Sequence, residues 1–136
     1  MSRNLGIAVA VFAIVALAAT AVLAGNAHFV GTPSITRSGN TLTASGKVAG
    51  LGNVPQITVT LNADAQCINP GSNKPQASNK QSVAAGGDFP VQNGKSDFSL
   101  SATATFKPDC TPPMSVEFSN VRITVTAADG TFLTFP

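Results

Sequence analysis

The stretch ITVTLNADAQC, residues 57–67, decides the fold of this chain. Every second residue from Ile57 to Ala65 is apolar, polar residues stand between them, and Cys67 falls on the apolar parity. Side chains of a strand alternate between its two faces, so this period of two is typical of a half-buried β-strand. The pattern therefore predicts a strand whose inward face ends in a cysteine.

A second stretch, FSLSATATF at residues 98–106, repeats this alternation, and Cys110 continues its apolar parity. Both sulfurs then lie on inward faces, where two strands can bring them together. Two cysteines in an exported chain form a disulfide by default, whereas a redox-active pair needs closely spaced, exposed thiols. The sequence predicts a structural Cys67–Cys110 bond.

Turn sequences predict the register of three further strand pairs, because loop length and turn type fix which residues face each other. The turns are Gly39-Asn40, Asn93-Gly94 (type I′) and the three-residue loop 128–130 with Gly130 left-handed. The facing pairs that they predict are Ile35 with Ala44, Gln92 with Lys95, Phe89 with Phe98, Val125 with Leu133 and Ile123 with Phe135.

Two irregularities are expected within strands. The apolar parity of the segment 115–127 changes between Phe118 and Val121, which predicts a β-bulge near Ser119-Asn120. Gly86-Gly87-Asp88 predicts a similar kink in the segment 80–92.

Together these patterns predict an all-β chain, a small immunoglobulin-like antiparallel β-sandwich of about seven strands with one disulfide. The hallmark Trp and the tyrosine corner of immunoglobulin domains are absent, because the chain has neither residue. The expected strands cover residues 29–38, 41–48, 56–66, 80–92, 95–106, 115–127 and 131–135.

The N-terminal segment predicts export. Arg3 precedes an uncharged apolar run from Leu5 to Ala24, which is typical of a secretory signal peptide. Small residues permit cleavage after Ala24 or after Ala27; we take residues 1–27 as the signal peptide and 28–136 as the β-sandwich domain. An uncleaved membrane anchor is the alternative, since about twenty apolar residues can span a bilayer. The expected location is secreted, extracellular or in the cell envelope, with no membrane contact after cleavage.

Composition argues against several classes of function. The 136 residues include one His, two Cys and 10% charged residues, with a net charge of +2. A single His assembles no Ser-His-Asp relay, the acidic residues are scattered, and no basic stripe suits nucleic acid. We therefore expect no enzyme, no cofactor and no nucleic-acid partner.

His28 suggests one metal site. Cleavage after Ala27 would make it the N-terminal residue and offer an α-amino nitrogen beside the imidazole. In this one residue the chain resembles lytic polysaccharide monooxygenases, whose copper brace also needs a second His that is absent here. A small copper-binding protein using His28 is kept as an alternative function.

The leading prediction is a secreted binding or structural module for an extracellular protein or glycan. Loops often carry binding residues, and a long polar loop at 67–79 faces a proline-stiffened one at 107–114 near both cysteines. A secreted hydrolase inhibitor is a further alternative. The candidate binding residues in these loops are Asn69, Asn73, Lys74, Lys107 and Asp109.

Overall fold

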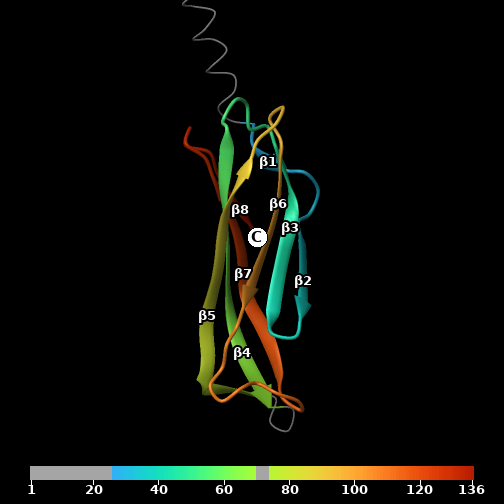
Figure 1. The fold of residues 1–136 in the computed structure, drawn as a ribbon, viewed down its shortest axis with the longest axis vertical. Helices are drawn as coiled ribbons and strands as arrows, with labels where there is room; N and C mark the ends of the chain where they lie inside the picture. Colours follow the sequence, from blue (N-terminus) through green and yellow to red (C-terminus); the bar gives the residue numbers. More distant parts are fainter. Residues whose placement is uncertain (1–25, 70–73) are drawn as a thin grey trace, which may run out of the picture.

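The computed structural model describes residues 26–69 and 74–136 (Figure 1). The predicted signal peptide therefore lies outside the described residues, except for its last two positions. The described chain is all-β and contains eight strands. They are β1 (His28–Phe29), β2 (Ser34–Ser38), β3 (Thr41–Ala49), β4 (Gln56–Asn69), β5 (Lys74–Pro90), β6 (Ser96–Thr103), β7 (Ser115–Thr126) and β8 (Phe132–Phe135).

The strands form two antiparallel sheets of four. In the first sheet β3 is central: β6 pairs with one of its edges, and β1 and β2 share the other. The second sheet has the order β5-β4-β7-β8. One hydrophobic core lies between the sheets and contains the inward residues of both. The predicted all-β, two-sheet architecture with one disulfide is confirmed.

The two alternating stretches behave as expected. In β4 every second residue from Ile57 to Ala65 is buried, and in β6 the buried positions include Phe98 and Leu100. Hydroxyl side chains occupy most outward positions of the first sheet, and Lys47 and Asp97 form an ion pair at two others. Thr41 contacts Thr103 and Thr43 contacts Ser101, with 3.0 Å between the oxygens of each pair.

The N-terminal strand differs from the prediction. Residues 29–38 were expected to form one strand, but the chain forms β1 and β2 with a break between them. Gly31 has a φ of 69°, in the left-handed region, and Pro33 is buried next to β2. Such residues interrupt a ladder because one turns the backbone and the other has no N–H to donate.

Most predicted registers are confirmed. Ile35 lies opposite Ala44, Gln92 opposite Lys95, and Val125 opposite Leu133. The pairing of β4 with β7 shifts where Ser119-Asn120 was expected to bulge, and Asn120 has a φ of 52°.

The predicted pairing of Phe89 with Phe98 is wrong, although the two rings do touch. After the Gln92–Lys95 bridge the hairpin opens, so that β5 joins one sheet and β6 the other. The rings then meet edge to face across the core, with centroids 6.4 Å apart. Phe29 extends this cluster by contacting Phe98 and Phe135.

The expected kink at Gly86-Gly87 is also wrong. Both glycines continue the ladder with β4, opposite Thr60 and Val59, without a register shift. Close packing explains the glycine at position 87, because a Cβ there would lie 3.4 Å from the Leu100 side chain and 3.3 Å from the Phe89 ring. A glycine within a strand can thus mark close packing rather than a bulge.

The two sheets differ in length at one end of the molecule. In Figure 1, β4, β5 and β7 continue well beyond the turn between β2 and β3. The segment 104–114, which connects β6 to β7, lies across this extension. It provides the buried Phe106 and the half-buried Met114 to the core. We call this end of the molecule the disulfide end, and the segment 104–114 the covering segment.

Candidate binding site at the disulfide end

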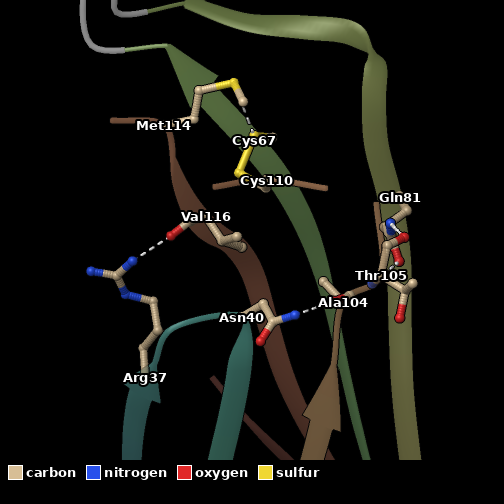
Figure 2. The surroundings of a disulfide bond; sticks show 9 residues. All are labelled: Arg37, Asn40, Cys67, Gln81, Ala104, Thr105, Cys110, Met114 and Val116. Atoms are coloured by element: carbon tan, nitrogen blue, oxygen red, sulfur yellow. Dashed lines mark hydrogen bonds between the residues drawn. A yellow bond between two sulfur atoms is a disulfide. The ribbon is translucent and has the colours of Figure 1, made fainter. Parts of the chain in front are cut away.

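The predicted bond between Cys67 and Cys110 is present, with 5.8 Å between the Cα atoms. Cys67 is fully buried on the inward face of β4, whereas Cys110 lies in the covering segment. The Met114 sulfur lies 3.8 Å from the Cys67 sulfur (Figure 2). Because a disulfide sulfur carries no hydrogen, this is a van der Waals contact. The disulfide therefore attaches the covering segment to the longer sheet.

Hydrogen bonds hold the start of that segment between the sheets. Asn40 donates from Nδ2 to the Ala104 carbonyl at 2.8 Å, and the Ala104 N–H donates to the Asn40 carbonyl at 2.8 Å. On the other side, the Gln81 amide both donates to and accepts from the backbone of Thr105. Figure 2 shows these two contacts on opposite sides of the chain. The segment is thus fixed before it reaches Cys110.

A hollow of about 510 Å³ lies beside the disulfide. Residues from β2, the β2–β3 turn, the covering segment and β7 form its walls. They are Arg37, Gly39, Asn40, Thr105, Phe106, Asp109, Cys110, Thr111, Pro112, Met114, Ser115 and Val116. The turn at 39–40 and the loop 107–114 therefore meet at one end of the molecule.

The walls of this hollow combine apolar surface with opposite charges. Arg37 donates from Nη1 to the Val116 carbonyl, which anchors its guanidinium against β7. Asp109 is exposed on the covering segment. Thr105, Thr111 and Ser115 add hydroxyl groups. A site of this kind suits a mostly uncharged ligand that can form hydrogen bonds.

The predicted binding residues do not all lie in loops. Lys107 and Asp109 are exposed on the covering segment, and Asp109 lines the hollow. Asn69 is the last residue of β4 and Lys74 the first of β5, so the predicted loop 67–79 is wrong over its described residues, 67–69 and 74–79. Asn73 lies outside the described residues.

The ladder between β4 and β5 explains this error. Asn69 faces Lys74 and Ile68 faces Pro75. Between these pairs and the pair Gln66–Lys80 the register shifts, because β5 contains four residues, 76–79, where β4 contains only Cys67. Because β5 is at the edge of its sheet, Pro75 can be tolerated there. Turn-forming residues in this stretch suggested a loop, but its described residues, 67–69 and 74–79, belong to the ends of β4 and β5.

Arg37 is the main residue of the site that sequence reasoning missed. It shares the inward parity of Ile35 in β2, and its side chain crosses to the other sheet. A basic residue at an inward position of a strand is a usable signal, since it must find a partner or reach solvent. Here its partner is a carbonyl at an open strand edge.

His28 lies at the other end of the molecule, in β1. Its exposed imidazole is 2.7 Å from the Asn26 carbonyl, measured from Nδ1. Across residues 26–69 and 74–136, no group of three His, Cys, Asp or Glu side chains is placed to hold a metal ion. Copper binding through an N-terminal His28 depends on cleavage after Ala27 and stays a prediction.

Within the described part of the chain, we find no helix of sufficient length and hydropathy to cross a membrane.

Comparison with known proteins found no matching family model, no matching curated protein and no matching solved structure.

Proposed function

We propose that this chain is a secreted, non-enzymatic binding module that captures a segment of an extracellular protein at its disulfide end. The observation that carries the proposal is the hollow beside Cys67–Cys110. Concave sites with fixed walls and a few polar groups favour binding, because little conformational entropy is lost when the ligand arrives. The disulfide itself is compatible with an oxidising, extracellular location.

A protein partner suits the hollow better than a glycan. Sugar rings commonly stack on exposed aromatic side chains, and the only aromatic residue among the described residues of the walls, Phe106, is buried. Arg37, Asp109 and the wall hydroxyls can instead form hydrogen bonds with the backbone and polar side chains of a peptide. Glycan binding is the alternative outcome of the test.

We also assign the sandwich to the immunoglobulin-like class. With β1 and β2 counted as one interrupted strand A, the sheets read A-B-E and C′-C-F-G. This assignment supports the function only in a general way, because many unrelated binding modules share the architecture.

Photo-crosslinking tests where the partner binds. A photoreactive amino acid is placed at Thr111, and in a matched variant at Lys95, which is exposed near the opposite end. Each purified protein is exposed to the native extracellular fraction, and crosslinked products are identified by mass spectrometry. We expect one protein species to crosslink from Thr111 and not from Lys95. Equal products from both positions would remove the hollow from consideration.

Substitutions then test the residues. We expect Lys107→Ala combined with Asp109→Ala to weaken binding of the identified partner by at least about tenfold, close to 1.4 kcal/mol. The melting temperature should not change, since both side chains are exposed. Lys95→Ala is the matched control. Unchanged partner binding, or binding to a glycan array with the same dependence on residues 107 and 109, would contradict the proposal.

A further inference from the structure

The outer edge of β5 is the longest open strand edge in the described residues. Among the described residues β5 pairs only with β4, and the bridge from Gln92 to Lys95 lies beyond its end at Pro90. Edges of this kind are usually protected by proline, bulges or inward charges. Between Lys80 and Phe89 the strand contains no proline and shows no register shift.

The direction of the unpaired groups follows from one hydrogen bond. The Val91 N–H donates to the Pro55 carbonyl at 3.0 Å, so odd-numbered residues of β5 are hydrogen-bonded to β4. In an antiparallel ladder bonded and non-bonded positions alternate. The N–H and C=O groups of the even-numbered residues therefore point to the open edge. These residues are Lys80, Ser82, Ala84, Gly86 and Asp88, and each of them is exposed.

We propose that this edge pairs with the β5 edge of a second copy of the chain, antiparallel and centred on Ala84. In this register Ala84 faces Ala84 of the second copy, Ser82 faces Gly86, and Lys80 faces Asp88. Each even residue then meets another even residue, which the backbone hydrogen bonds require. The five facing pairs provide about ten backbone hydrogen bonds, two for each pair.

Charge selects this register from those with the same hydrogen-bond parity. A slip of two residues along either strand would separate Lys80 from Asp88 of the second copy. In the centred register the pair forms twice, because a two-fold axis makes an interface self-complementary. Opposite charges that face each other across strands are stabilising, and like charges are destabilising. The Oδ1 atom of Asp88 accepts a hydrogen bond from Thr58 at 2.7 Å, which leaves Oδ2 for a lysine.

The side chains at the centre leave the approach open. Ala84 and Gly86 are the smallest residues that the edge could carry, so no bulky group projects over the two-fold axis. Near this centre, the Gln81 amide forms two hydrogen bonds with the backbone of Thr105 and so connects β5 to the covering segment. The edge is therefore held in place before a partner arrives. The β5-β4-β7-β8 sheets of the two copies would join into one continuous sheet of eight strands.

Sedimentation equilibrium of the native disulfide-bonded protein tests the charges. We expect a concentration-dependent dimer. Lys80→Glu and Asp88→Lys should each raise the dissociation constant by about tenfold, because two attractive pairs become repulsive. The double variant restores the opposite charges and should return the constant toward that of the unaltered protein. A monomer at every concentration, or a dimer indifferent to both single changes, would overturn the proposal.

Disulfide trapping tests the register. Directly facing, hydrogen-bonded residues lie about 5.5 Å apart at Cα, within the range that a disulfide spans. Ala84→Cys should therefore give a covalent dimer under mild oxidation. Thr134→Cys, on an exposed position of the opposite edge strand β8, is the control and should stay monomeric. Equal crosslinking of the two variants would show random collision and count against the register.

Discussion

Gly46 of β3 shows how one side chain can determine the residue opposite to it. A Cβ at this position would lie 3.0 Å from Cζ and 3.1 Å from Cε1 of Phe98. The Phe98 ring is buried and packs edge to face with Phe29 and Phe89, so it has little room to move. Only the absence of a side chain lets the ring lie over β3.

We expect Gly46→Ala to lower the free energy of unfolding by about 1–3 kcal/mol, because overpacking displaces the Phe98 ring. Guanidinium denaturation measures the change. Gly86→Ala is the matched control, since its Cβ would meet only the Val59 carbonyl oxygen at 3.8 Å. In the Phe98→Leu background Gly46→Ala should lower the free energy of unfolding by a smaller amount. If the effects of the two substitutions on that free energy were simply additive, the steric explanation would be contradicted.

Among single elements, the turn between β7 and β8 is organised around the carboxyl group of Asp129. Hydrogen bonds from the Thr131 hydroxyl, at 2.7 Å, and then from its N–H, at 3.0 Å, lower the pKa of Asp129 below its ordinary value of 3.8. Both donors stabilise the ionised form. They also hold the three-residue loop 128–130 in the conformation that fixes the register of β8.

A lowered pKa in the folded state means that the ionised Asp129 favours folding. This contribution is present above the ordinary pKa and is lost as the pH falls through the lowered value. We expect Thr131→Val to raise the pKa of Asp129, and Thr131→Ser to keep it low because the hydroxyl remains. Carboxyl ¹³C shifts followed by NMR during an acid titration measure both. The same titration curve in all three proteins would contradict this account.

The elements also show how far the sequence reaches. The alternation of 57–67 and 98–106 predicted two strands, their buried faces and the disulfide, because burial on one face leaves a period of two. Turn length predicted the register of β8. Neither pattern could reveal that β5 and β6 separate after Gln92, because the sheet that a strand joins depends on contacts distant in sequence.

The candidate site was predicted only in part for a related reason. Lys107 and Asp109 are exposed on the covering segment, as a proline-rich loop beside a cysteine suggests. The described residues of the stretch 67–79, namely 67–69 and 74–79, instead continue β4 and β5, where an edge strand tolerates Pro75. Arg37 joins the site from another sheet, and no local pattern of the sequence contains that contact.

On the scale of the whole molecule, the disulfide compensates for the unequal length of the two sheets. Beyond the β2–β3 turn the longer sheet is covered by the segment 104–114 rather than by strands (Figure 1). Cys67 and Cys110, separated by 43 positions, connect that cover to β4. A loop of this length gives a stabilisation of about 4 kcal/mol by chain-entropy arguments.

We expect the double variant Cys67→Ser, Cys110→Ser to lose about this amount of stability in guanidinium denaturation. Hydrogen exchange should locate the effect, with amides of 104–116 losing protection well before those of β3 and β6. Reduced unaltered protein is the control, since it keeps both sulfur atoms without the bond. Uniform loss of protection along the chain would contradict a local role for the disulfide.

The first described residues and the disulfide lie at opposite ends of the long axis. Asn26 lies against Gly50, close to the end of β3, whereas β4 runs from Gln56 at that same end to Cys67 at the other. Tension applied between the N-terminal segment and a partner held at the disulfide end would act along the strands. The ladders of both sheets would then bear the load in shear, with many hydrogen bonds resisting together rather than opening one after another.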